Sequence, residues 1–181
     1  MVQQVNELMN SGFFVTNQIA VSYIEPIEKK YVHKLNEINV AISEIEKIVK
    51  ADTYTYYTCR LLPQFRTSPF FDHSNDHCSM VHLIECCRQV AIALPHVFHN
   101  VPFEGYRYII KKLDVRLEQF FEQDSNVRLF CKEKVIKYTD TQKSFELEFE
   151  ILQDQTTKAT IKGDSYILHE CIHPSNPILS Q

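Results

Sequence analysis

The fold is decided by the sequence SMVHLIECCRQVAIAL, which covers residues 79–94. Apolar residues lie on most sides of this stretch when it is coiled as a helix, which is typical of a helix buried in a protein core. Ser79 or Asp76 suits the N-cap of such a helix, and Pro95 is expected to end it. We therefore predict a buried helix over residues 79–94.

Four polar side chains interrupt this apolar helix, at His82, Glu85, Arg88 and Gln89. Residues three or four positions apart lie side by side on a helix, so the four form one stripe. A carboxylate on a core helix is costly unless it is paired or functional. Glu85 is therefore either a structural ion pair with Arg88 or an acid, base or orienting group, and the stripe faces solvent, a partner or a site.

The sequence after this helix alternates between apolar and polar residues, which predicts strands with one buried face. Short polar turns separate four such segments, at residues 109–118, 127–138, 145–151 and 159–169. Gly163 is a candidate for a β-bulge. Strands joined in this way predict an antiparallel meander.

The sequence before the helix is less regular. Residues 53–62 are rich in Tyr and Thr and predict a strand, whereas residues 38–49 suit either a helix or a strand. We favour a strand, because the Tyr-rich strand would otherwise lack a neighbour in sequence. One helix and one antiparallel sheet predict an α+β domain in which the sheet wraps around the helix. We place it at residues 31–172, between an N-terminal extension (1–30) and a C-terminal tail (173–181).

The composition argues against several classes of function. The net charge is −4 and the Lys and Arg residues are scattered, so nucleic acid is not an expected partner. There is no apolar run near the length that spans a membrane, no signal-peptide pattern and no glycine-rich phosphate loop. The six cysteines form no CxxC pair, which fits a reducing compartment. We expect a cytoplasmic protein without a cofactor.

Two other chemistries compete at the start of the helix. The residues that favour a metal site are Asp72, His73, Asp76, His77, Cys78 and His82. No HExxH or paired CxxC accompanies them, so we expect no metal. A cysteine nucleophile at Cys78, Cys86 or Cys87, with His82 as its base, is the second alternative. Buried cysteines in a core helix are the simpler interpretation.

Three short motifs surround the helix. They are Val32-His33-Lys34, the aromatic pair and aspartate Phe70-Phe71-Asp72, and Glu85-Cys-Cys-Arg88-Gln89, which has the form Glu-x-x-Arg-Gln. Together they resemble the A-factor biosynthesis hot-dog family, whose members make butyrolactone signal precursors in actinomycetes. Pro63 stands at the family's Pro-Arg element, although Gln64 follows it and the nearest arginine is Arg66. The resemblance covers about residues 31–120.

This resemblance implies a hot-dog fold, a homodimer with sites between its two units, and a substrate carried on coenzyme A or an acyl carrier protein. It implies acyl transfer or a related step in secondary-metabolite or signal biosynthesis. A dehydratase, a thioesterase and a non-catalytic module that binds an acyl ligand or a partner are the alternatives. The chain is also distantly similar to β-hydroxyacyl carrier-protein dehydratases. Glu85 matches their acid, but Phe71 matches their histidine and His73 lies two residues away.

The helix stripe and the loop before it supply the expected site. The residues expected to be catalytic are Glu85, Arg88 and His73. Those expected to bind substrate are Phe70, Phe71, Asp72, His77, His82 and Gln89. An acyl chain needs an apolar slot, and its thioester carbonyl needs a donor such as a backbone N–H at the helix start.

Overall fold

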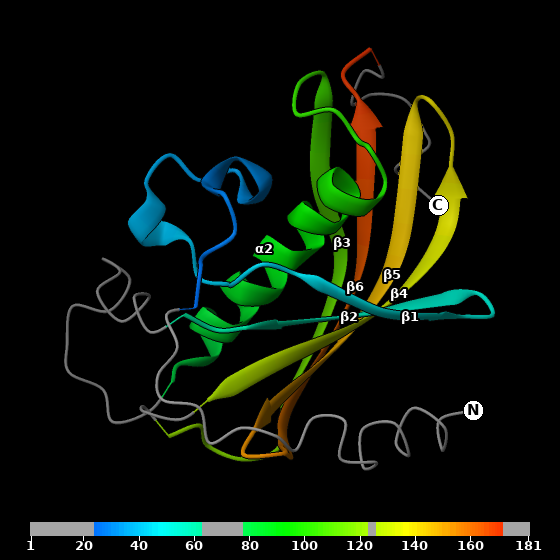
Figure 1. Cartoon of the computed structure of the whole chain (residues 1–181). Helices are drawn as coiled ribbons and strands as arrows, with labels where there is room; N and C mark the ends of the chain where they lie inside the picture. The colour runs from blue at the N-terminus through cyan, green and yellow to red at the C-terminus, as the bar shows by residue number, and fades with distance from the viewer. Residues whose placement is uncertain (1–23, 63–77, 123–125, 172–181) are drawn as a thin grey trace.

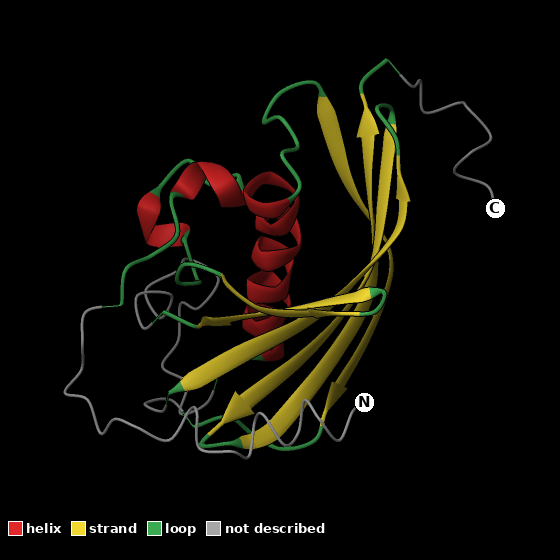
Figure 2. Cartoon of the chain, turned by 45° about the vertical axis from the view of Figure 1, so that its right-hand side comes forward, coloured by secondary structure: helices red, strands yellow, loops and turns green. Residues whose placement is uncertain are grey.

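A computed structural model of the chain describes residues 24–62, 78–122 and 126–171. Its long helix, α2 (Met80–Phe98), lies along the concave side of a curved antiparallel sheet (Figure 1). Two short 3-10 helices, η1 (Lys29–Val32) and η2 (Glu37–Asn39), lie on the other side of α2 (Figure 2). The helix is therefore the middle layer, and the predicted α+β hot-dog fold is confirmed.

The sheet contains six strands among the described residues. They are β1 (Glu46–Ala51), β2 (Tyr54–Arg60), β3 (Tyr106–Leu117), β4 (Val127–Tyr138), β5 (Gln142–Gln153) and β6 (Thr156–His169). Their spatial order is β1-β2-β4-β5-β6-β3, and every neighbouring pair is antiparallel. The predicted four-strand meander is thus correct only for β4 to β6, because β3 pairs with β6 instead of β4.

The connection between β3 and β4 explains this order, since it passes the β5–β6 turn. The backbone N–H groups of Glu118 and Gln119 donate to the carbonyl oxygen of Lys158 in β6. Further along, the buried Gln153 amide of β5 accepts from and donates to the backbone of Glu122 at 3.0 Å in each case. These contacts hold the connection after β3 against the ends of β5 and β6.

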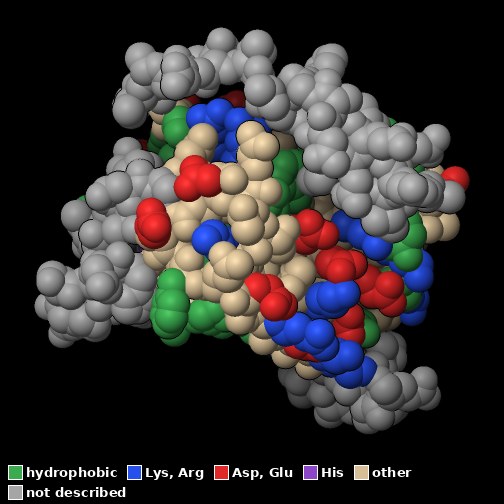
Figure 3. Space-filling view, turned by 90° about the horizontal axis from the view of Figure 1, so that it is seen from below, with side chains coloured by type: hydrophobic (Ala, Val, Ile, Leu, Met, Phe, Trp, Pro, Cys, Tyr) green, Lys and Arg blue, Asp and Glu red, His purple; other side chains and the backbone are tan. Residues whose placement is uncertain are grey.

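Alternation in β4 and β5 places one face of the sheet against α2. Apolar side chains such as Leu129 and Phe149 are buried on that face. The other face carries cross-strand ion pairs, including Lys132 with Glu148 at 3.5 Å. On the molecular face shown in Figure 3, charged side chains of both signs lie close together.

The edge strand β3 does not bury one face as its alternation predicts. Ile110, Leu113 and Leu117 are each at least 44% exposed. A register shift between Ile110 and Lys112 interrupts the alternation, and no described strand covers the outer edge. The predicted bulge therefore lies in β3 and not at Gly163, which pairs with Leu113. A Cβ atom at Gly163 would lie 3.1 Å from the carbonyl oxygen of Lys112.

Helix α2 begins as predicted and ends later. The Ser79 side chain caps it by accepting the backbone N–H of His82. The helix continues past Pro95 to Phe98, and the carbonyl of Pro95 accepts backbone N–H groups from His99 and Val101, which follow the helix. The lost Pro95 N–H is therefore tolerated in the last turn. No helix among the described residues is long and apolar enough to cross a bilayer.

Residues 38–49 do not form the single strand that we expected. The 3-10 helix η2 ends at Asn39, the next residues are extended, and the strand β1 begins only at Glu46. Between these elements, the Gln89 side chain accepts the backbone N–H of Ala41 and donates to the carbonyl oxygen of Asn39, both at 2.9 Å. Gln89 of the helix thus satisfies backbone groups that a neighbouring strand would satisfy in a sheet.

Candidate functional site

Glu85 and Arg88 form a two-pronged ion pair one turn apart on α2. Arg88 Nε donates to Glu85 Oε2 at 2.6 Å, and an Arg88 Nη atom donates to Glu85 Oε1 at 2.8 Å. The Glu85 side chain is 18% exposed and that of Arg88 is 32% exposed. A planar guanidinium matches a carboxylate in this way, so the pair is well oriented and half-buried.

Two further donors converge on the same carboxylate. Lys34 Nζ lies 2.8 Å from Glu85 Oε1, and Gln89 Nε2 donates to that oxygen at 3.0 Å. Burial alone would raise the pKa of Glu85, but the hydrogen bonds from Arg88, Lys34 and Gln89 outweigh it and lower the pKa to about 2. Glu85 is therefore ionised and held from three sides near neutral pH.

The polar stripe of the helix faces the chain's own N-terminal segment. Glu85 and Gln89 of this stripe are followed on the same face by His96, seven residues after Gln89. Residues 33–41 supply their partners, which are His33, Lys34, Asn39 and Ala41. Gln89 is fully buried. The stripe thus attaches the η1–η2 segment to the helix.

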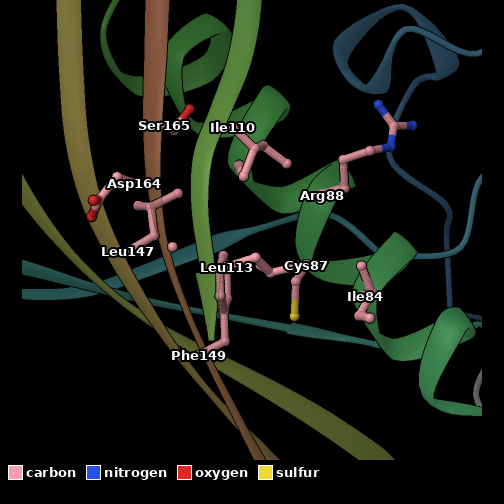
Figure 4. A pocket seen from close by; sticks show the side chains of 11 residues that line it. Ile84, Cys87, Arg88, Ile110, Leu113, Leu147, Phe149, Asp164 and Ser165 are labelled. Carbon is pink, nitrogen blue, oxygen red and sulfur yellow. The ribbon is translucent and has the colours of Figure 1, made fainter. Parts of the chain in front are cut away.

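An open apolar groove lies between α2 and the edge strand β3, with β5 and β6 as its floor (Figure 4). The volume that it encloses is small, about 30 Å³, and the rest of the groove is open to solvent. Its apolar walls are formed by Ile84 and Ala91 of α2, Ile110 and Leu113 of β3, and Leu147 and Phe149 of β5. Such a lining suits an apolar ligand chain.

Arg88 joins the groove to the charged cluster. Its side chain is part of the groove lining, but its guanidinium turns away toward the η1–η2 side of the helix (Figure 4). This is the usual arrangement of an arginine whose stem covers apolar surface while its head meets polar groups. The groove and the Lys34–Glu85–Arg88 cluster are therefore contiguous.

A pair of histidines near the end of α2 was not among the residues predicted for the site. His33 Nε2 lies 2.9 Å from His96 Nε2, and the Tyr108 hydroxyl lies 2.8 Å from the same His96 atom. Burial lowers the pKa of both histidines. Val32-His33-Lys34 was the only sequence indication, through the family resemblance. The pairing with His96 depends on tertiary structure.

A second buried cluster, which the sequence did not indicate, lies between the C-terminal end of α2 and the strands β2 and β4. Glu133 of β4 is 1% exposed. It accepts a hydrogen bond from Tyr57 at 3.0 Å and lies 2.9 Å from Nε2 of His99. Alternation along β4 places Glu133 on the same inward face as Leu129 and Cys131, so the chain buries a carboxylate there and satisfies it with hydrogen bonds.

The remaining predicted site residues are placed as follows. Phe70, Phe71, Asp72, His73 and His77 lie outside the described residues. His82 is buried in the first turn of α2. Glu85, Arg88 and Gln89 are brought together, as their spacing predicts.

The structure describes only some of the residues on which the two rival chemistries depend. Burial raises the pKa of Cys86 and Cys87 well above the usual range, which keeps both as unreactive thiols. None of the six cysteines is in a disulfide. Within the described residues, no three His, Cys, Asp or Glu side chains are placed to hold a metal ion. Asp72, His73, Asp76 and His77 of the suggested metal cluster lie outside that part.

Comparison with known proteins agrees with the fold. The family model of the A-factor biosynthesis hotdog domain (AfsA) matches residues 16–168. The solved structure of yhdA from Lactococcus lactis, described as a proposed thioesterase, has a TM-score of 0.50 at 9% identity, over 75% of this chain and 99% of that one. The conserved protein PA5202 from Pseudomonas aeruginosa has a TM-score of 0.45 at 12% identity, over 79% and 100% of the two chains. No curated protein sequence matches this chain.

Proposed function

The chain belongs to the A-factor biosynthesis hotdog domain family, and from this premise we propose that it acts on an acyl thioester by transferring the acyl group to a hydroxyl acceptor. The observation that carries the proposal is the apolar groove that runs up to Arg88, beside the carboxylate of Glu85. A thioester substrate has the same two parts, an apolar acyl chain and a polar reacting end.

The groove accounts for the acyl part. Its walls are aliphatic and aromatic side chains, and burying each methylene in such a slot contributes about 0.8 kcal/mol. Ala91 is the last of the helix residues that line the groove, and its small side chain leaves room there. A larger side chain at this position would fill the space that we assign to the acyl chain.

The charged cluster accounts for the polar end. With a pKa near 2 and donors from Arg88, Lys34 and Gln89, Glu85 is a weak proton acceptor at neutral pH. We assign it to holding Lys34 and Arg88 in place, so that these cations orient the polar part of the substrate. The roles predicted for His73 and the other loop residues before α2 remain predictions.

We also propose that a second copy of the chain covers β3. The strand is twelve residues long, lies at the sheet edge and exposes Ile110, Leu113 and Leu117. A long edge strand with exposed apolar residues pairs readily with another strand. Because Ile110 and Leu113 also line the groove, a partner on β3 would close its open side. The site would then lie between two protomers.

The test uses acyl-coenzyme A and acyl carrier protein thioesters with a set of hydroxyl acceptors. Thiol release is followed continuously, and mass spectrometry identifies the acyl product. We expect ester formation by the wild type and at least a tenfold loss in Ala91→Phe. Val97→Phe is the matched control, because Val97 lies on the same helix, is 38% exposed and is not part of the groove lining.

Other outcomes identify the alternatives. Free acid as the sole product would replace transfer with thioester hydrolysis, and loss of water from a β-hydroxyacyl substrate would indicate a dehydratase. Saturable binding without turnover would make the protein an acyl-binding module. Neither turnover nor binding with any thioester would overturn the proposal. Thermal unfolding of each variant shows whether its fold is intact.

A further inference from the structure

A chain of hydrogen-bonding groups leads from the end of α2 to the protein surface. His96 Nδ1 lies 2.7 Å from the carbonyl oxygen of Val101, and His96 Nε2 lies 2.9 Å from Nε2 of His33. His96 is buried, whereas His33 is exposed. A buried carbonyl is thus connected through one imidazole to a second imidazole that solvent reaches.

The carbonyl fixes the positions of the protons along this chain. Because a carbonyl oxygen only accepts, Nδ1 of His96 carries the proton and Nε2 of a neutral His96 presents a lone pair. The Tyr108 hydroxyl at 2.8 Å and Nε2 of His33 both face this lone pair, and a neutral His33 that donates from Nε2 keeps its own lone pair on Nδ1. Among the described residues, no other side chain forms a hydrogen bond with the His33 ring, so its Nδ1 can accept a proton from a substrate.

Both rings are held in place from several sides. His33 terminates η1 in the left-handed conformation, with φ of 53°, and its backbone N–H bonds back to Lys30. Its ring meets Tyr108 edge-on at a centroid distance of 4.9 Å. His96 stacks on Phe103 at 4.4 Å. A base that is already oriented avoids the entropy cost of ordering it during reaction.

The exposed imidazole lies next to the Lys34–Glu85–Arg88 cluster. Lys34, the next residue, contacts Glu85, and the positive charge of Arg88 acts on His33. Burial, His96 and Arg88, in that order, lower the pKa of His33 below its usual 6.5. Burial likewise lowers the pKa of His96. The two rings are therefore neutral at pH 7, which is the state that the proton positions above require.

We propose that His33 is the general base of the reaction and that His96 is its positioning residue. This inference rests on the proposed acyl transfer. The acceptor hydroxyl gives its proton to Nδ1 of His33 while its oxygen bonds to the thioester carbonyl carbon. The carbon–sulfur bond then breaks, and the proton passes from His33 to the thiolate, so that a thiol and an ester are released. Water in place of the acceptor gives the free acid by the same steps.

Kinetics with acyl-coenzyme A test the assignment. Loss of a general base costs about 100-fold or more in kcat, so His33→Gln is expected to lose at least that much with little change in KM. In wild type, we expect kcat to rise with pH as His33 loses its proton, with a pKa below 6.5. This rise is expected to be absent in His33→Gln. His96→Phe keeps a ring against Phe103 but removes the acceptor, so it shifts this rise and lowers kcat less. His169→Gln, at a histidine outside this chain of groups, is the control with unchanged kinetics.

Nitrogen-15 NMR of the histidine side chains gives a readout that needs no turnover. The expected tautomers are Nδ1–H for His96 and Nε2–H for His33, and His96→Phe is expected to mix the tautomers of His33. A wild-type protein without turnover would defeat the proposed function, whatever the tautomers are. An active wild type with a fully active His33→Gln variant, or with Nδ1–H on His33, would overturn the present inference alone.

Discussion

Lys34 Nζ and Glu85 Oε1 lie 2.8 Å apart, and both side chains are 18% exposed. This contact joins the segment that follows η1 to the second turn of α2. It also places two cations, Lys34 and Arg88, on one carboxylate. The geometry of the candidate site therefore depends on how the N-terminal segment docks on the helix.

Replacing Lys34 by Met is expected to lower the free energy of unfolding by about 1–3 kcal/mol, because it removes one donor from a half-buried carboxylate. Chemical denaturation measures the change. Lys29→Met is the control, since its ion pair with Glu37 spans 3.9 Å between exposed side chains and is expected to contribute less than about 1 kcal/mol. Equal losses in the two variants would contradict the role given to Lys34.

The pH dependence of stability tests the state of Glu85. Its folded-state pKa is depressed from 4.5 to about 2, so its stabilising contribution is complete above about pH 4.5 and is lost as the pH falls toward 2. Wild type is expected to lose on the order of 3 kcal/mol more than Glu85→Gln across this range. Parallel curves for the two proteins would show that Glu85 titrates normally in the fold.

The sequence predicts the fold where one periodic pattern dominates. Helix α2 and strand β4 were predicted from apolar spacing, and the approach of Arg88 to Glu85 follows from helix geometry. The spacing does not reveal the partner of β3, because strand order depends on where the connection after Leu117 passes. Likewise, the contacts of Lys34 with Glu85 and of His33 with His96 join distant parts of the chain, and no local pattern encodes them.

Gln89 is expected to be the most sensitive position of the helix stripe. Gln89→Leu keeps the approximate volume but leaves the backbone N–H of Ala41 and the carbonyl of Asn39 without a partner inside the protein. We expect a loss of about 2–4 kcal/mol in the free energy of unfolding. Hydrogen exchange at Ala41 should accelerate in the same variant. Gln119→Leu, at an exposed position, serves as the control.

The proposed dimer makes a charge-swap prediction at the exposed edge strand. An antiparallel pairing of two β3 strands centred on Leu113 brings Lys112 opposite the partner's Asp114. Lys112→Glu or Asp114→Lys alone is expected to weaken the dimer, because like charges then face each other. Combining both changes again places opposite charges face to face across the two strands and should restore the dimer. Sedimentation analysis measures this, and a monomeric wild type would exclude the interface.

The dependence of kcat/KM on acyl chain length tests the central claim, that the groove beside Arg88 binds the acyl chain of a thioester. Each methylene buried there contributes about 0.8 kcal/mol, or roughly a fourfold increase in kcat/KM, until the groove is full. The account predicts this rise for wild type and Val97→Phe, and a flat response for Ala91→Phe. A flat response in wild type, or an equal rise in Ala91→Phe, would contradict it.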